Sequence, residues 1–310
     1  MKQDEQLQTQ FVTYLLTEKR VAENTFLAYQ RDLKQFLSYL HDRGQSVESC
    51  TRKDLKHFVK KMRQDSLAAR SVSRKISTLK LFFDFVSDRF AMQNKADLLI
   101  FPKIEQGLPL YLTDNELYDL LSAAQQDSSA KGVRNKVIVH VLYATGMRVS
   151  ELANLRLEQL HFDTGFIRVW GKGNKERMVP LPQATLELLQ YYLDAAYRKL
   201  QPKKEILDKE RYLFPTFIGG RMQPITRQSI WNIIKHLLKV AGIQKNVSPH
   251  TLRHSLATHL LKNGANIRAI QLLLGHEKIN TVQIYTHLET SQLRKIYDEA
   301  HPRSKNDEKG

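Results

Sequence analysis

The residues best suited to chemistry lie between Ser248 and His287, and the first of them are His250 and Arg253. Ser248 is a favoured N-cap and Pro249 suits the first helical position, so the sequence predicts a helix that begins here. His250 and Arg253 then lie one turn apart beside the positive end of the helix dipole, an arrangement that suits an anion. Alternatively, the two residues form an ordinary surface pair, or the histidine packs in the core.

Two more reactive side chains follow in the same segment. A second helix is predicted from about Ile267 to Leu274, with Gly275 as its C-cap, and His276 comes directly after it. Tyr285 lies on a short element beyond. A lone tyrosine near a C-terminus usually serves packing, so the case for a site depends on what the rest of the chain supplies.

A cationic residue upstream, Arg148, is a candidate to join them. It follows the turn Ala144-Thr145-Gly146, which ends an apolar helix predicted from Asn135 to Leu142. Glu151 is close enough in sequence to hold the arginine side chain. The alternative is a purely structural ion pair.

Lys172 lies at the tip of a predicted β-hairpin whose strands are residues 166–170 and 176–181. The glycines and the asparagine of Gly171-Lys-Gly-Asn-Lys175 permit the positive φ angles of a tight turn. This turn is not a phosphate-binding P-loop, because the pattern G-x-x-x-x-G-K-[ST] is absent and the context is strand-turn-strand. The lysine is therefore either solvated or able to reach into a groove.

The elements that carry these residues follow from the spacing of apolar side chains. Periods of three and four up to about residue 90 predict four helices, the pattern of a small helical bundle. Residues 99–112 contain two prolines and a glycine without clear periodicity and are the predicted linker. Near the C-terminus, a helix over residues 291–300 has an apolar face too small to stand alone, and we expect the final ten residues to be disordered.

The charge of the chain indicates a polyanionic partner. The 310 residues have a formal net charge of +16, and a basic excess of this size most often means nucleic acid. Both parts are basic, because Lys and Arg outnumber Asp and Glu by 19 to 13 up to Leu110 and by 29 to 19 beyond it. The alternative is a basic enzyme with no nucleic-acid partner.

The strongest local excess lies in the third and fourth predicted helices. Between Thr51 and Lys80 there are ten Lys and Arg residues against two acids. Contact with phosphates explains this ratio better than a merely solvated face. The predicted DNA-binding residues are Arg52, Lys53, Lys56, Lys60, Arg70, Arg74 and Lys75.

Composition also limits the alternatives. Cys50 is the only cysteine, so an internal disulfide and a cysteine-rich zinc site are excluded. The motif H-E-x-x-H is absent, and no histidine is paired with a carboxylate at a convincing ligand spacing, so we expect no metal site. No apolar run is long enough to span a bilayer and the first residues do not form a signal peptide, so we expect a cytoplasmic protein without membrane contact.

Taken together, these elements closely resemble the tyrosine recombinase family, the lambda-integrase-like proteins, and within it the Xer type. The family pattern is an arginine after an A-T-G turn, a lysine in a β-hairpin, H-x-x-R, a later histidine or tryptophan, and then a nucleophilic tyrosine. The resemblance covers nearly the whole chain. The matching residues, in order, are Arg148 in ATGMRVSEL, Lys172 in GKGNKER, His250 and Arg253 in HTLRHSLATHLL, His276 in LLGH and Tyr285 in YTH.

The resemblance implies a mainly α protein with a small antiparallel β-sheet, in which two domains form a C-shaped clamp around DNA. A helical core-binding (SAM-like) DNA-binding domain would span residues 1–98, and an α+β catalytic domain would span residues 113–310. Tyr285 would be the nucleophile, assisted by His250, and Lys172 the general acid. Arg148, Arg253 and His276 would hold the phosphate, and no metal or other cofactor would be needed.

The resemblance also implies partners. The substrate would be double-stranded DNA with two half-sites, held by a homo- or hetero-tetramer that exchanges its C-terminal helices. A second Xer recombinase and an FtsK-like DNA translocase are further candidates, and the expected task is chromosome dimer resolution at a dif-like site through a Holliday junction. The alternatives are integration of a mobile element, a type IB topoisomerase, and an architectural DNA-binding protein with an idle catalytic set.

Overall fold

The computed structural model describes residues 2–103, 110–171, 176–201, 211–275 and 287–303. The chain divides into unit 1, Met1–Gly107, and unit 2, Leu108–Gly310. Each unit has its own hydrophobic core. Within the described ranges, every helix is too short or too polar to span a bilayer.

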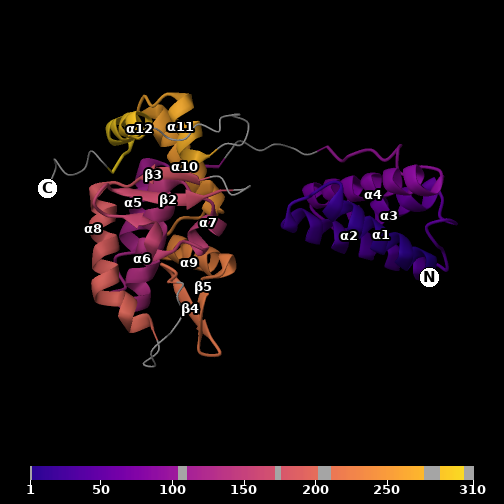
Figure 1. Cartoon of the computed structure of the whole chain (residues 1–310), viewed down its shortest axis with the longest axis horizontal. Helices are drawn as coiled ribbons and strands as arrows, with labels where there is room; N and C mark the ends of the chain where they lie inside the picture. The colour runs from indigo at the N-terminus through magenta and orange to yellow at the C-terminus, as the bar shows by residue number, and fades with distance from the viewer. Residues whose placement is uncertain (1, 104–109, 172–175, 202–210, 276–286, 304–310) are drawn as a thin grey trace. The chain divides into compact units, whose positions relative to one another are not determined.

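Unit 1 is, in its described residues, a bundle of four helices, as predicted (Figure 1). Aromatic rings fill the bundle: Phe11 meets Phe82 edge-on with ring centroids 5.2 Å apart, and Phe36 meets Phe58 at 5.3 Å. The apolar faces that identify the helices are thus the faces that pack together. The helices are α1 (Lys2–Thr17), α2 (Glu23–His41), α3 (Arg52–Gln64) and α4 (Ala69–Phe90).

Unit 2 is mainly helical, with two small antiparallel sheets among its described residues. In the first sheet the strand order is β1-β2-β3, and Val169 of β2 lies opposite Arg177 of β3. The second sheet is the hairpin β4–β5. The strands are β1 (Leu160–His161), β2 (Phe166–Trp170), β3 (Glu176–Pro180), β4 (Pro215–Ile218) and β5 (Arg221–Pro224).

The helices of unit 2 surround the buried helix α6. In the described ranges the α-helices of unit 2 are α5 (Asp114–Ala123), α6 (Ala130–Thr145), α7 (Val149–Ala153), α8 (Gln183–Tyr191), α9 (Arg227–Val240), α10 (Pro249–Lys262), α11 (Ile267–Leu274) and α12 (His287–Ala300). A π-helical segment, Tyr192–Tyr197, continues α8. Helices α11 and α12 lie at one end of the unit and the β4–β5 hairpin at the other (Figure 1). The helical spacing of Leu252, Leu256, Leu260 and Leu261 predicts that all four anchor α10 in the core. The first three are buried, but the prediction is wrong for Leu261, which is 52% exposed.

The C-terminal helix α12 packs on unit 2 of its own chain. Leu293, Tyr297 and Ala300 are buried there, and the Tyr297 hydroxyl donates to the Ala144 carbonyl oxygen at 2.8 Å. The small apolar face of α12 is thus completed by a buried hydrogen bond to the last turn of α6.

The expectation of disorder from His301 onward is wrong for residues 301–303. The His301 ring is fully buried and stacks on Tyr297 with ring centroids 4.5 Å apart. Burial and the neighbouring Arg303 charge lower the pKa of His301 to about 3, so the ring is neutral at physiological pH. Arg303 also donates to His140 Nδ1 at 2.6 Å. Residues 304–310 lie outside the described ranges.

Gly146, the C-cap of α6, should tolerate no side chain. Its φ is +56°, and a Cβ atom would lie 2.6 Å from Leu274 Cδ2 and 2.9 Å from Leu256 Cδ2. Because strain and overpacking add, we expect Gly146→Ala to lower the free energy of unfolding by about 3 kcal/mol. Urea unfolding followed by tryptophan fluorescence measures this in unit 2, since both tryptophans of the chain, Trp170 and Trp231, belong to it.

Gly242 provides the matched control. Its φ is +70°, but a Cβ atom there would meet nothing within 4 Å. Gly242→Ala should therefore cost only the left-handed backbone term, about 1 kcal/mol. Equal losses of stability in the two variants would contradict the tight packing around Gly146.

Candidate active site

Arg253 is held in place by two main-chain carbonyls from separate parts of unit 2. Ser248 caps α10 as predicted, since its hydroxyl accepts from the Thr251 N–H, and Pro249 is the first helical residue. Arg253, 8% exposed, donates from Nη1 to the Gly146 carbonyl at 2.7 Å and from Nη2 to the Leu274 carbonyl at 2.6 Å. The guanidinium is therefore fixed against the C-terminal ends of α6 and α11.

Arg148 lies beside this group, directly after the turn at Gly146. Its Nη1 donates to Glu151 Oε1 at 2.9 Å and its Nη2 to the Gly275 carbonyl at 3.2 Å. The Arg148 main-chain N–H donates to Glu151 Oε2 at 2.8 Å. The expected pairing with Glu151 is thus present, and the Arg148 side chain remains 37% exposed, so part of its guanidinium is open to a ligand.

Arg177, which is not among the residues predicted from the sequence, joins this group. Its Nη1 and Nη2 donate to the two oxygens of Glu151 at 3.1 and 2.7 Å, and its Nε donates to the Leu273 carbonyl at 3.2 Å. The Arg177 side chain is only 6% exposed. Strand alternation could have revealed it, because Arg177 and the buried Val179 share one face of β3.

Three successive carbonyls at the C-terminal end of α11 thus each accept from a different arginine. The Leu273 carbonyl accepts a hydrogen bond from Arg177, the Leu274 carbonyl from Arg253, and the Gly275 carbonyl from Arg148. The last carbonyls of a helix have no partner inside the helix and form the negative end of its dipole, so they suit cations. Gly275 closes the helix at φ +66°, as predicted for its C-cap.

The charges of this cluster leave an excess that favours an anion. Burial and the nearby charges of Arg148 and Arg177 lower the pKa of Arg253 to about 10, so Arg253 is still charged at neutral pH. Burial tends to raise the pKa of Glu151, but hydrogen bonds and charge from Arg177, with donors from Arg148, outweigh burial and lower this pKa below its ordinary value. One carboxylate therefore compensates three guanidinium groups: Glu151 accepts from Arg148 and Arg177, and its charge also acts on Arg253.

Of the remaining predicted catalytic residues, the structure describes only His250. His250 lies in the first turn of α10 and is exposed. Lys172, His276 and Tyr285 lie outside the described residues.

His259 is buried, with its ring nitrogens 2.9 Å from the Tyr143 hydroxyl and 2.8 Å from the Leu112 carbonyl, which makes it a structural group. In the described ranges, no group of three or more His, Cys, Asp or Glu side chains is arranged to hold a metal ion.

Unit 1 requires one correction to the predicted DNA-binding set. Lys75 is buried, and its ammonium group donates to Asp32 Oδ1 at 2.8 Å and to Gln35, so it is a structural group that cannot reach DNA. Arg52 pairs with Asp97 at 3.0 Å, and Arg74 pairs with Asp32 at 2.5 Å. The exposed members without an ion pair to another described residue are Lys53, Lys56, Lys60 and Arg70.

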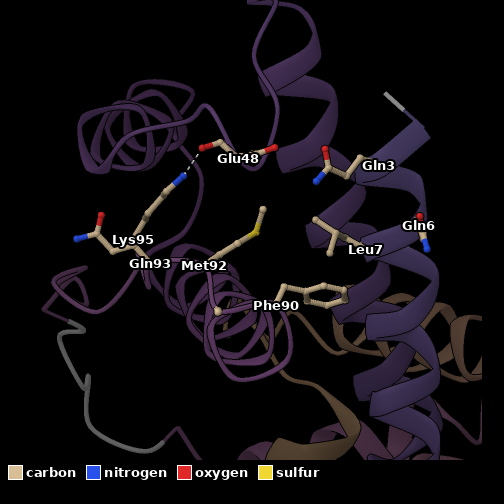
Figure 2. Close-up of a pocket in the computed structure, with 9 residues that line it drawn as sticks. Gln3, Gln6, Leu7, Glu48, Phe90, Met92, Gln93 and Lys95 are labelled. Carbon is tan, nitrogen blue, oxygen red and sulfur yellow. Dashed lines mark hydrogen bonds between the residues drawn. The ribbon is translucent and has the colours of Figure 1, made fainter.

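Unit 1 also contains a pocket of about 710 Å³ between the start of α1 and the end of α4 (Figure 2). Its lining combines apolar groups such as Leu7 and Phe90 with amides, and Lys95 Nζ donates to the Glu48 carbonyl at 2.6 Å. Lys95 is the only cation among the described residues that line it, so the pocket lacks the converging donors of the arginine cluster.

Comparison with known families agrees with the geometry. Residues 111–292 match the phage integrase family, and residues 9–89 match the phage integrase N-terminal SAM-like domain. The chain therefore belongs to the phage integrase family, the tyrosine recombinases, and its similarity to proteins named tyrosine recombinase XerD makes it a recombinase of the Xer type.

The relatives that indicate this type are similar over almost their whole length. The chain is 40% identical to tyrosine recombinase XerD of Listeria monocytogenes serotype 4b (strain F2365), over 95% of this chain and 98% of that protein. It is 38% identical to tyrosine recombinase XerD of Chlorobaculum tepidum, over 94% of this chain and 95% of that protein.

Solved structures show the same fold at lower identity. The Tn1549 transposon integrase in complex with transposon right-end DNA is 20% identical with a TM-score of 0.69, over 94% of this chain and 98% of that chain. The XerH site-specific recombinase bound to its difH substrate is 23% identical with a TM-score of 0.65, over 87% of this chain and 78% of that chain.

Glu151 should make stability depend on pH. At pH 7, Glu151→Gln should lower the free energy of unfolding by about 3–5 kcal/mol, because it breaks a buried ion pair. Since the folded-state pKa of Glu151 is depressed, its contribution is fully present above the unfolded-state value of about 4.3 and is lost as the pH falls through the folded-state value. The difference between wild type and variant should therefore shrink only below about pH 4.3.

Urea unfolding followed by tryptophan fluorescence at a series of pH values tests this. The control is Glu158→Gln, because the Glu158 side chain is 70% exposed. Its effect should stay within about 0.5 kcal/mol at every pH. A Glu151→Gln difference that grows on acidification would contradict the assigned sign.

Proposed function

We propose that the chain cleaves and rejoins double-stranded DNA at a specific site through a covalent link between Tyr285 and a 3′ phosphate. The observation that carries this proposal is the pair of guanidinium groups of Arg148 and Arg253, each anchored from behind on main-chain carbonyls. Such anchoring fixes the orientation of the donors that remain, so little reorganisation is needed when a phosphodiester enters.

Two arginines suit the transition state of phosphoryl transfer. In-line attack at phosphorus places additional charge on the non-bridging oxygens, and planar guanidinium groups can donate to these oxygens in pairs. In this proposal Arg148 and Arg253 bind the two non-bridging oxygens, and His276 adds a further donor. The fixed positive charges take the part that a metal ion plays in other nucleases.

The remaining residues would move the protons. The Tyr285 hydroxyl, with an ordinary pKa of about 10, needs a base, and His250 is the candidate. The tyrosine oxygen attacks phosphorus as the bond to the 5′ oxygen breaks, and Lys172 gives that oxygen a proton. The products are a 3′-phosphotyrosyl ester and a free 5′ hydroxyl, so the bond energy is kept for the reverse attack that rejoins DNA.

The biological task we propose is chromosome dimer resolution at a dif-like site of two half-sites, through a Holliday junction. The support is the similarity to proteins named XerD over nearly their whole length. The working form would be a DNA-bound tetramer, alone or with a second Xer recombinase, activated by an FtsK-like translocase. We expect a cytoplasmic location, which cell fractionation would test.

Assembly of this tetramer would require a change in α12. In the structure α12 covers part of its own unit through Leu293 and Tyr297. We propose that on DNA α12 leaves this surface and occupies the equivalent surface of the next protomer. The same contacts would then be made between chains, so the exchange would have only a small net cost in free energy.

A nicked suicide duplex should trap the covalent intermediate in EDTA. The DNA would come from the replication-terminus region of the host, and denaturing gels would reveal an adduct with wild type and none with Tyr285→Phe. Arg253→Lys should lower the single-turnover cleavage rate on the order of 10²-fold, because the planar donor set is lost. DNA affinity, measured by gel shift, should be retained.

Other outcomes separate the alternatives. DNA binding without an adduct would contradict the catalytic proposal and favour an architectural role. Relaxation of any supercoiled plasmid by a monomer would instead indicate a type IB topoisomerase, and an adduct only on the ends of a mobile element would indicate an integrase. Mass measurement of the trapped complex should give four protomers on two duplexes if the tetramer is correct.

The exposed lysines of α3 should bind DNA phosphates. We expect the triple variant Lys53→Ala/Lys56→Ala/Lys60→Ala to weaken DNA binding. The negative slope of log K against log salt should decrease in magnitude by about 0.9 for each phosphate that the protein no longer neutralises. The control removes three positive charges from α2 and from the residues after α1: Lys19→Ala/Arg31→Ala/Lys34→Ala. An equal decrease of slope in both triple variants would contradict a DNA-binding surface on α3.

A further inference from the structure

We propose that Arg177 is a positioning residue for DNA cleavage. It would keep guanidinium donors of Arg148 free to bind a phosphate, and it would fix the position of Arg148 relative to the lysine hairpin, the hairpin of β2 and β3 whose connecting residues include Lys172. This proposal rests on the proposed function. Arg177 would not touch DNA; it would act through Glu151. Its side chain is 6% exposed, and its only described polar partners are Glu151 and the Leu273 carbonyl.

Arg177 competes with Arg148 for the oxygens of Glu151. A carboxylate can accept two parallel N–H bonds from one guanidinium, and such a bidentate pair would occupy the donors that a phosphate needs. Here Arg177 supplies donors to both Glu151 oxygens, and the Arg148 side chain supplies only one, to Oε1. Arg177 thus prevents Glu151 from binding both ends of the Arg148 guanidinium and neutralising it.

Arg177 also connects the lysine hairpin to the arginine cluster. It belongs to β3, opposite Val169 of β2, and these two strands lead into and out of the hairpin that contains Lys172. From β3 its side chain reaches α7 through Glu151 and the end of α11 through the Leu273 carbonyl. One side chain therefore fixes the base of the lysine hairpin relative to two elements that hold the phosphate-binding arginines.

The end of α11 packs directly on the Arg177 side chain. A Cβ atom on Gly275 would lie 3.1 to 3.3 Å from Cδ, Nε and Nη1 of Arg177. This close packing leaves the Arg177 side chain little freedom to move. A group held this firmly can determine the position of Arg148, whereas a solvated arginine could not.

The test compares Arg177→Met and Arg177→Lys with the wild type in single-turnover cleavage of the suicide duplex at saturating protein. We expect Arg177→Met to lower the cleavage rate on the order of 10²-fold with DNA affinity retained, and Arg177→Lys to recover part of that rate. The matched control is Arg168→Met on the neighbouring strand, since Arg168 is 42% exposed and pairs with Glu176 at 3.2 Å. It should cleave like the wild type.

Two further measurements separate positioning from a loss of folding. A scissile methylphosphonate carries no negative charge, so a variant with a misplaced Arg148 should lose less rate on it than on the phosphodiester; a general structural defect would lower both rates equally. The double variant Glu151→Gln/Arg177→Met removes the buried carboxylate and its buried arginine partner together, so it should recover part of the stability that Arg177→Met loses. Recovery should be incomplete, because the charge of Arg253 then lacks the compensation that Glu151 gives it. The cleavage rate of the double variant should stay low, and the two substitutions should be non-additive.

The positioning role would be overturned if Arg177→Met cleaved as fast as the wild type. It would also be overturned if the variant lost the same factor in rate on the phosphodiester and on the methylphosphonate. Recovery of cleavage by the double variant would also overturn it, because stability alone would then explain the defect. Absence of any adduct with the wild type would instead contradict the proposed function, so the two failures are distinguishable.

Discussion

The attraction between the C-terminal end of α11 and three guanidinium groups is the interaction on which the rest of unit 2 depends. Like every α-helix, α11 ends on carbonyls that have no partner within the helix. Three of these carbonyls receive Arg177, Arg253 and Arg148. The mutual repulsion of the arginines is limited by Glu151 between them, and burial makes each hydrogen bond stronger than it would be in water.

Such a cluster needs a rigid frame, because buried charges are stable only when their partners stay in place. Helix α6 provides it: its apolar residues are buried on nearly every side, and its cap, Gly146, gives its carbonyl to Arg253. Arg148 is the N-cap of α7, which follows the end of α6 closely, and Arg253 lies near the start of α10, after its N-cap Ser248. The positions of the charges are therefore fixed by helix termini, where free backbone groups are found.

Local sequence patterns predict the helix ends that carry the arginine cluster, but not every residue of the cluster. Ser248 and Pro249 define the start of α10 and Gly275 the end of α11, because caps and left-handed backbone have strong residue preferences. The hairpin β4–β5 was missed, since each strand has only four residues and contains a proline. Arg177 and His301 were missed for another reason: both are polar groups buried by contacts with residues far away in sequence, and no local pattern records such partners.

A buried arginine–carboxylate cluster is poor evidence for stability, because apolar residues of similar size often stabilise a core as well or better. Its value here is geometric: Glu151 accepts from two arginines and thereby fixes the angle between α7 and β3. The end of α6 is also shared, because Tyr297 of α12 donates to the Ala144 carbonyl, two residues before the Gly146 carbonyl that binds Arg253. The exchange of α12 proposed above would therefore act on the same helix end that orients Arg253, and would link the proposed assembly to the arrangement of the cations.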